Sequence, residues 1–445
     1  MRGRIDLRCS LLLGVLGLAG WSIRAEDPAV LAIKSGVGDW PGFRGADRTG
    51  ISKETGLLSQ WPKEGPKLLW KVSGLGGGFS TPSMFGGKIY LMGSKGQPDK
   101  GGGRPKGGGD GFTESVICLN QEDGKEIWST EVGNTMGGYP GPRSTPTIEG
   151  GMAYAVSSNG NLVCLKADTG DLVWKKDYRK EYGGRAGAWA FAESPLIDGD
   201  VVVCTPGGAK AALVAMNKKD GKEIWRAPIT DLEGKRGPYA TAGYASVIVA
   251  RVHGGKQYMQ FLSGGVVGIE AETGKLLWNY DRPANQVANC STVLFKDNSV
   301  FAATAYNTGG GRARIDREGS NYKAEELFFI QKMQNHHGGM LLIGDHIYGT
   351  GSGSLMCVDF KDGKEVKSVR AAGKGSVTYA DGHIYHRGED GTICLVEANP
   401  ELKEKGRFKQ PERSGQPAWA YPVVVGGKLY IRDWDNMFCY DVKAP

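Results

Sequence analysis

One eight-residue pattern recurs four times in this chain. QEDGKEIW, ADTGDLVW, KKDGKEIW and AETGKLLW end at Trp128, Trp174, Trp225 and Trp278, and each has a glycine four residues earlier, at Gly124, Gly170, Gly221 and Gly274. The tryptophans are 46, 51 and 53 residues apart, and a period in this range is typical of repeat architectures. The repeat therefore predicts an array of similar structural units.

A single unit has the pattern of four short strands joined by tight turns. From residue 145 to 176, the segments TPTIE, MAYAVS, NLVCLKA and DLVWKK are separated by GG, SNG and DTG. Asn-Gly and related pairs supply the positive φ angles that hairpins between twisted strands require. Glycine is also about twice as frequent as usual, with 71 of 445 residues. Each unit is therefore predicted to be a four-stranded antiparallel sheet.

Eight such units can be counted along the chain. They open near Ser80, Ser144, Ser194, Ser246, Ser291, Gly339, Ser376 and Ala420. The eighth unit has only three strands, whereas residues 68–72 form an outermost strand with no unit before it. Pairing of 68–72 with 437–442 would complete the ring and leave no open sheet edge. The sequence thus predicts an all-β, eight-bladed β-propeller over 67–445, closed by an N-terminal strand and preceded by an arm at 26–66.

The first 25 residues have the features of a secretory signal peptide, with Arg2, Arg4 and Arg8 before an apolar stretch and a cleavage site ending at Ala25. The apolar stretch, CSLLLGVLGLAGW, is shorter than the roughly 20 residues of a transmembrane helix. Cys9 stands at its start, where it cannot become the first residue of a mature lipoprotein. We therefore expect an exported protein, periplasmic or secreted, cleaved near Ala25, with no lipid anchor and no transmembrane segment.

The charge of the chain gives no indication of a nucleic-acid partner. The formal net charge is +7, of which the signal peptide contributes +3 through four arginines and Asp6, so about +4 remains. Because this charge is small and scattered, we expect no binding of nucleic acid.

The cysteines follow the repeat. Ten residues before the repeat tryptophans, and at the same place in later units, stand small residues: Cys118, Cys164, Ala215, Gly268, Ala313, Cys357, Cys394 and Cys439. A small residue facing a tryptophan suits close packing between neighbouring blades. Equivalent positions of different blades should lie beyond the roughly 7 Å limit for a disulfide, so we expect none among these five cysteines. Cys204 and Cys290 fall outside the pattern, and their state stays open.

The pattern small-x5-Gly-x3-Trp resembles the tryptophan-docking repeat of propellers of the pyrroloquinoline-quinone (PQQ) type. That superfamily includes quinoprotein alcohol dehydrogenases and the propeller subunit of the outer-membrane β-barrel assembly machinery. The resemblance covers residues 67–445 and is weaker in the last four units, where Lys367 replaces the tryptophan. The segments DWPGFRGADRTGIS and NHHGG also resemble exported bacterial PQQ-like repeat proteins.

The resemblance leaves an enzyme and a binding module as alternatives. It implies that a dehydrogenase would hold PQQ and calcium in the propeller channel, with an Asp base, a stacking Trp and commonly two adjacent cysteines. The chain has no adjacent cysteines, no DxDxDG-like cluster and no long insertions. We therefore expect no catalytic residues and no cofactor, with a PQQ- and calcium-dependent dehydrogenase as the alternative.

The residues just before each unit are predicted to surround one mouth of the channel, because the innermost strand of each blade lines it. They include Phe79, Arg143, Trp189, Tyr244, His337, Lys374 and Trp419. Aromatic and cationic side chains together suit a planar or anionic ligand. The alternative, which we favour, is that these large side chains simply plug the mouth.

His336 and His337 are adjacent. On an extended strand their side chains would point to opposite faces, so they would not share a metal. No acidic partner is evident from spacing. We therefore predict a structural role and no metal site, although one histidine facing the channel stays an open alternative.

Two glycine-containing segments have structural interpretations. GGGRPKGGGDG, at 101–111, lacks the phosphate-binding pattern GxxxxGK[ST] and is predicted to be a loop within blade one. In the arm, Trp40 and Phe43 are expected to hold the segment against the ring. These features together predict a non-catalytic exported module that binds an envelope protein of unknown identity, as a monomer or as a subunit of a complex.

Overall fold

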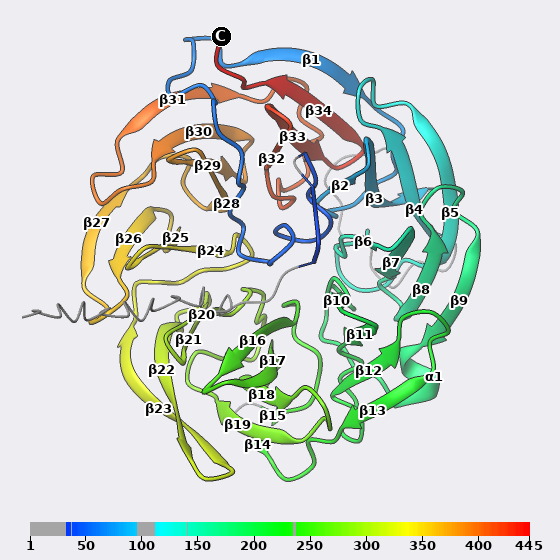
Figure 1. The fold of residues 1–445 in the computed structure, drawn as a ribbon. Coiled ribbons are helices and arrows are strands. Elements are labelled where there is room, and N and C mark those ends of the chain that lie inside the picture. Colours follow the sequence, from blue (N-terminus) through cyan, green and yellow to red (C-terminus); the bar gives the residue numbers. More distant parts are fainter. Residues whose placement is uncertain (1–32, 37, 96–111, 140, 235–236) are drawn as a thin grey trace, which may run out of the picture.

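The repeats fold into eight four-stranded antiparallel sheets arranged around a central axis (Figure 1). The computed structural model describes residues 33–36, 38–95, 112–139, 141–234 and 237–445. In the first seven blades the strands follow in chain order from the axis to the rim, as hairpin connections require. This arrangement confirms the predicted all-β, eight-bladed propeller.

The first four blades contain these strands. Blade one has β2 (Ser83–Phe85), β3 (Lys88–Lys95), β4 (Thr113–Asn120) and β5 (Glu126–Asn134). Blade two has β6 (Thr147–Glu149), β7 (Met152–Val156), β8 (Asn161–Lys166) and β9 (Leu172–Asp177), followed by the single helix of the described residues, α1 (Tyr178–Tyr182). Blade three has β10 (Leu196–Asp198), β11 (Val201–Cys204), β12 (Leu213–Asn217) and β13 (Glu223–Ala227). After a small hairpin, β14 (Glu233–Gly234) and β15 (Gly237–Pro238), blade four has β16 (Ile248–Val252), β17 (Gly255–Phe261), β18 (Val266–Glu270) and β19 (Leu276–Tyr280).

The later blades repeat this order. Blade five has β20 (Leu294–Lys296), β21 (Ser299–Thr304), β22 (Gly309–Glu318) and β23 (Asn321–Ile330). Blade six has β24 (Met340–Ile343), β25 (His346–Thr350), β26 (Leu355–Asp359) and β27 (Glu365–Val369). Blade seven has β28 (Gly375–Ala380), β29 (His383–Gly388), β30 (Thr392–Glu397) and β31 (Glu404–Lys409).

Blade eight joins the two ends of the chain. It contains β32 (Val423–Val425), β33 (Lys428–Asp433), β34 (Asn436–Asp441) and, as the outermost strand, β1 (Lys67–Val72). Leu68 lies opposite Tyr440, and Val72 lies opposite Met437. The predicted closure of the ring by the N-terminal strand is therefore confirmed.

The repeat tryptophans join neighbouring blades. The indole nitrogens of Trp128, Trp174 and Trp225 each donate a hydrogen bond, of 3.0–3.1 Å, to a carbonyl oxygen of the next blade. Each ring also lies against the turn glycine of that blade, and a Cβ on Gly170 would come within 2.6 Å of Trp128. These glycines have φ near +70°, which other residues rarely adopt. The eight-residue pattern thus encodes both the turn and the surface on which the preceding tryptophan packs.

The small residues ten positions before each tryptophan face it, as predicted. Cys118, Ala215 and Gly268 are register partners of Trp128, Trp225 and Trp278 on adjacent strands of the same blade. Cys118 and Ala215 also belong to hydrophobic clusters shared with the next blade, whose turn glycine provides the surface on which the indole packs. The small side chains leave space for the indole above its own sheet, and a Cβ on Gly268 would come within 2.1 Å of Trp278.

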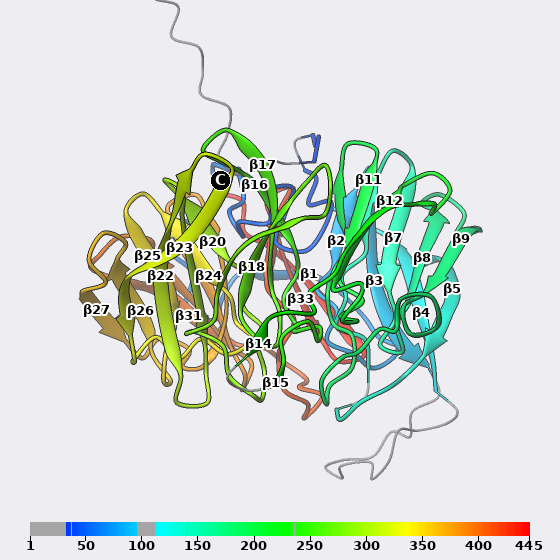
Figure 2. The ribbon, with the colours of Figure 1, turned by 90° about the horizontal axis from the view of Figure 1, so that it is seen from below.

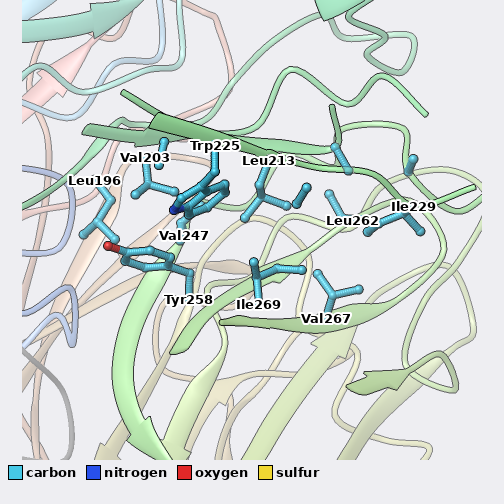
Figure 3. Close-up of a cluster of buried hydrophobic side chains, with 14 of the residues drawn as sticks. Leu196, Val203, Leu213, Trp225, Ile229, Val247, Tyr258, Leu262, Val267 and Ile269 are labelled. Carbon is cyan, nitrogen blue, oxygen red and sulfur yellow. The ribbon is translucent and has the colours of Figure 1, made fainter. Parts of the chain in front are cut away.

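The hydrophobic core lies between the faces of adjacent blades. Figure 3 shows the interface of blades three and four, where Trp225 of β13 packs with Leu213 and Val203 of blade three and Tyr258 of blade four. The rings of Trp225 and Tyr258 are 6.0 Å apart. Because each sheet is buried on both faces, its inner strands are almost continuously apolar.

The arm closes one end of the channel. Drawn in dark blue, it crosses the centre of the ring in Figure 1 and lies at one end of the blades in Figure 2. Trp40 forms a bridge with Met84 of β2, and Ser52 donates its backbone N–H to Tyr379 of β28. The Arg48 guanidinium donates to the carbonyl oxygens of Ser194, Val247 and Pro195. The arm thus ties the inner strands of many blades together.

Several predictions concern residues outside the described ranges, namely the signal peptide at 1–25 with Cys9, and the glycine-rich loop at 101–111. The seven cysteines of the described ranges, including Cys204 and Cys290, are all free thiols. Among the described helices, none has the length and apolar character needed to cross a membrane.

Candidate functional site

The end of the channel opposite the arm holds a cavity of about 1010 Å³. Its walls are mainly the loops that lead from the outermost strand of one blade to the innermost strand of the next. The arm contributes its floor through Phe43, whose ring meets that of Tyr421 edge-on at 5.2 Å. We call this space the channel cavity.

The structure brings all the predicted mouth residues together. Phe79, Arg143, Trp189, Tyr244, His337, Lys374 and Trp419 all line the channel cavity. Our favoured interpretation, that these side chains plug the mouth, is wrong, because they surround an open space. Each lies in an equivalent inter-blade loop, so the repeat itself places them in a ring.

Cys290 completes this ring. It stands immediately before Ser291, as the other seven residues stand before or close to the opening of their own blades, and its side chain lines the channel cavity. Burial raises the pKa of the Cys290 thiol to about 12, although Arg143 and Lys374 act in the opposite direction. At neutral pH the thiol is therefore protonated and a poor nucleophile. This position could have been found from the sequence, because Cys290 stands at the same place in its repeat as the other mouth residues.

Trp419 is the centre of an aromatic cluster on the wall of the cavity. Its ring lies 4.6 Å from that of Phe79, 5.3 Å from Tyr139 and 5.4 Å from His337. On another part of the wall, Trp189 meets Tyr244 edge-on at 5.5 Å. These rings offer flat apolar faces next to the cationic groups of the mouth.

Arg143 lies among these rings. Its guanidinium carbon is 5.2 Å from the centre of Phe79 and 5.8 Å from that of Trp419. It donates to the carbonyl oxygens of Tyr139, at 2.8 Å, and Gly141, at 3.2 Å. Among the described residues, no carboxylate lies within ion-pair distance of it. The cavity therefore has a positive charge that is held by aromatic faces and main-chain dipoles.

Glu389, in the turn between β29 and β30, is the acceptor for three donors of the cavity. Its Oε1 accepts hydrogen bonds from His337 Nε2 and Trp419 Nε1, both at 2.7 Å, and lies 3.2 Å from Lys374 Nζ. The three donors come from the loops before blades six, seven and eight. Glu389 was not predicted from the sequence, because that turn carries different residues in other blades and its pairing depends on the ring geometry.

These contacts change the pKa values of Glu389 and of the two histidines. Burial raises the pKa of Glu389, but the contacts with His337, Trp419 and Lys374 outweigh it and lower the value to about 2. Burial lowers the pKa of His337, against the effect of Glu389. Burial, His337 and Lys374 lower the pKa of His336 to about 3. At neutral pH an ionised carboxylate therefore lies beside two neutral imidazoles.

The two histidines face the same side, which corrects our prediction. His336 and His337 lie in the loop between β23 and β24, not on a strand, and their rings are 5.0 Å apart. The buried Asn335 holds this loop, since its Nδ2 donates to Gly339 O at 2.9 Å and to Thr350 O at 3.2 Å. A Cβ on Gly338 would clash with Gly375 O, at 1.7 Å, so only glycine allows this approach. The motif NHHGG thus encodes a tight loop that presents both rings to the cavity.

A second site candidate lies on the rim. Six exposed apolar side chains occupy the outermost strands of four consecutive blades, eight, one, two and three: Leu68, Leu69, Ile127, Leu172, Val173 and Ile224. We call them the outer arc. Their strands β1, β5, β9 and β13 are also the edge strands of their sheets, and among the described residues one side of each backbone is not paired to another strand. Exposed apolar residues beside an open edge suit the addition of an extended polypeptide.

The fold and the repeat define an eight-bladed propeller of the PQQ-like type. A family model described as outer membrane protein assembly factor BamB matches residues 113–369, more than half of the chain. The chain belongs to this family of PQQ-repeat proteins.

Curated relatives include two kinds of protein. BamB of Shewanella oneidensis is 22% identical over 316 residues, covering 68% of this chain and 72% of that protein. Quinohemoprotein alcohol dehydrogenase ADH IIB of Pseudomonas putida is 28% identical over 158 residues, covering 34% of this chain and 21% of that protein. The solved quinohemoprotein alcohol dehydrogenase of Comamonas testosteroni has the same fold, with a TM-score of 0.59, 13% identity, and 92% and 81% of the two chains covered.

Proposed function

We propose that this protein is a non-catalytic binding propeller of the cell envelope, exported by its N-terminal segment, which binds an extended segment of a partner protein. The observation that carries the proposal is the outer arc, where exposed apolar residues and open strand edges coincide on four consecutive blades. Scattered exposed apolar residues are normal on a protein surface, but a row along adjacent edge strands is typical of a contact surface.

The relatives support an envelope role. Several curated relatives are outer membrane protein assembly factors, whose name describes assembly and not catalysis. The sequence-predicted signal peptide agrees with a location outside the cytoplasm. A non-catalytic role also agrees with the channel cavity, whose Cys290 thiol is protonated and whose Glu389 is already held by three donors.

Charged substitutions in the outer arc test this proposal. The variant Leu172→Glu/Ile224→Glu alters blades two and three, and the matched control Leu327→Glu/Val366→Glu alters β23 and β27 on the opposite side of the ring (Figure 1). In crosslinking capture from envelope extracts of the native host, we expect the wild type and the control to retain one partner. The first variant should recover it at least about tenfold less, a loss of roughly 1.4 kcal/mol. Equal recovery by both variants would contradict the proposal.

The second candidate function is a PQQ-dependent dehydrogenase, favoured by the aromatic and cationic channel cavity on the axis of the ring. The cavity does not fit the calcium that such a cofactor would need. Calcium takes six to eight oxygen ligands, whereas the described lining has Glu389 and Asp390 as its carboxylates, and Oε1 of Glu389 is engaged by three donors. We therefore propose that PQQ with calcium binds weakly or not at all.

A titration separates the two functions. With PQQ and calcium added to the protein, we expect no saturable quenching of tryptophan fluorescence, although Trp189 and Trp419 line the cavity and would respond to a bound quinone. Quenching with a micromolar or tighter constant, about −8 kcal/mol, that disappears when calcium is chelated would favour the dehydrogenase instead.

A further inference from the structure

We propose that His336, His337 and Glu389 form a binding site for a divalent transition-metal ion, of which Zn²⁺ is the model, on the wall of the channel cavity. One donor atom from each side chain lies within 4.8 Å of the other two. A four-coordinate ion with bonds of about 2.0–2.2 Å has ligand atoms roughly 3.4 Å apart. The 4.8 Å limit is about 1.4 Å longer than this, whereas His337 Nε2 and Glu389 Oε1, at 2.7 Å, are closer than it, so side-chain rotations in both directions would be needed to seat the ion.

The contacts of the two histidines indicate which nitrogen of each would bind the ion. His336 Nε2 lies 3.0 Å from the hydroxyl of Tyr306, and His337 Nε2 lies 2.7 Å from Glu389 Oε1. Within the described residues, Nδ1 of His337 has no hydrogen-bond partner. For His336, the Tyr306 hydroxyl would hold Nε2 while Nδ1 binds the ion, because the second ring nitrogen of a histidine ligand is usually held in this way. For His337, Nε2 is the nitrogen that faces Glu389, so the ion would replace their hydrogen bond.

The surrounding chain holds the three groups in place. Asn335 ties the ends of the histidine loop together, and the indole N–H of Trp419 orients the Glu389 carboxylate. Tyr306, which contacts His336, is held with φ at +56°, in a region that residues with a side chain rarely occupy. Such backbone conformations persist where the surroundings enforce them, commonly at binding sites.

The donor types select the class of ion. Two imidazole nitrogens and one carboxylate oxygen suit zinc and neighbouring first-row ions, whereas calcium prefers oxygen ligands alone. The ion would take one lone pair from each ring and one from the carboxylate. On His337 the ring proton would move from Nε2 to Nδ1, so that Nε2 faces the ion together with Glu389. Lys374, whose side chain is 41% exposed, can move its ammonium group from Glu389 into solvent when the ion binds. Positions left open on the ion would face the channel cavity.

Metal titration of the tag-free full chain tests the site. After treatment with a chelator, titration with Zn²⁺ followed by calorimetry should give one saturable site per chain, with a micromolar or tighter dissociation constant, and Ca²⁺ should not compete. His337→Gln and Glu389→Gln should each weaken Zn²⁺ binding by about 100-fold or more, because each removes a ligand. Tyr306→Phe should weaken it by roughly tenfold through loss of the outer contact.

The matched control is His346→Gln, which removes a histidine on β25 that does not line the cavity and should leave the affinity unchanged. Thermal unfolding without metal establishes that each variant is folded; if His337→Gln is not, His336→Gln carries the test. Absence of saturable Zn²⁺ binding by the wild type would overturn the proposal. So would equal affinity in the ligand variants, or an equal loss in the control. Because the outer arc is not involved, failure here leaves the proposed function intact.

Discussion

The arm end of the channel and its open end differ in what their charged groups contact. At the arm end, Arg44 and Arg48 are almost fully buried, and their guanidinium groups donate to carbonyl oxygens of the ring and of the arm itself. At the open end, Arg143, Lys374 and Glu389 line a cavity and remain partly exposed. Both ends are built from the same repeat, so the difference comes from the arm.

The charged groups at the arm end are therefore structural, whereas those at the open end are accessible to a ligand. Buried arginines at the arm end satisfy main-chain acceptors that would otherwise lack partners. The open end holds its charges on the wall of a cavity, where a solute can reach them. We therefore expect substitutions at the arm end to affect stability strongly, and substitutions at the open end to affect it much less.

The largest effect is expected for Arg48→Met. This change leaves the carbonyl oxygens of Ser194, Val247 and Pro195 without their donor in a buried place. Because hydrogen bonds to a charged group contribute about 1.5–3 kcal/mol each, we expect a loss of about 4 kcal/mol, measured by denaturant unfolding. The exposed arm residue Lys53, changed to Met, is the control and should alter stability by less than about 0.5 kcal/mol. A similar small change for Arg48→Met would show that the arm does not stabilise the ring.

The next largest effect on stability is expected at Glu193, and it depends on pH. It is buried near Arg48, accepts a hydrogen bond from Tyr178 at 3.0 Å, and burial raises its pKa to about 7 despite its hydrogen bonds and Arg48. A raised carboxyl pKa gives a contribution that is fully present below about pH 4.5 and is lost as pH rises through 7. We expect the wild type to lose roughly 3 kcal/mol over this range through this group, and Glu193→Gln to show a correspondingly flatter pH profile. Parallel profiles of the two proteins would contradict this.

Glu389, at the open end, should act in the opposite direction. Its pKa is lowered to about 2, so its contribution to stability is present above about pH 4.5 and is lost as the pH falls toward 2. Because the carboxyl is partly exposed, we expect a loss of about 1–2 kcal/mol on acidification, absent in Glu389→Gln. Unfolding measured at several values between pH 3 and 6 would detect it. If the stability of Glu389→Gln fell on acidification as much as that of the wild type, His337 and Trp419 would not stabilise the carboxylate.

The smallest effect is expected for Lys374→Met. Its ion pair with Glu389 is partly exposed, at 3.2 Å, and such pairs contribute about 0–1 kcal/mol. We expect a change in unfolding free energy of no more than about 0.5 kcal/mol, with Lys332→Met as a control for another exposed pair. A loss comparable to that of Arg48→Met would remove the distinction between the two ends.

The sequence predicted the fold far better than the cavity. The Gly-x3-Trp repeat and its hairpin turns are local signals, and closure by residues 68–72 followed from counting strands. The ring of mouth residues was predicted in the same way, because each of them stands at the same place in its repeat. Glu389 and the direction of His336 could not be predicted, since they depend on contacts between blades and on the loop held by Asn335.

Closure by β1 also constrains when the molecule can fold. Lys67 pairs with Asp441, so two strands 374 positions apart in the chain must meet before the ring is complete. Contacts of such long sequence separation form slowly, because the entropy of closing the loop opposes them until the last contacts are made. Until β34 has formed, β1 has no strand to pair with and the flank of blade one stays uncovered. This period of incomplete closure is when the chain is most exposed to aggregation and to proteases.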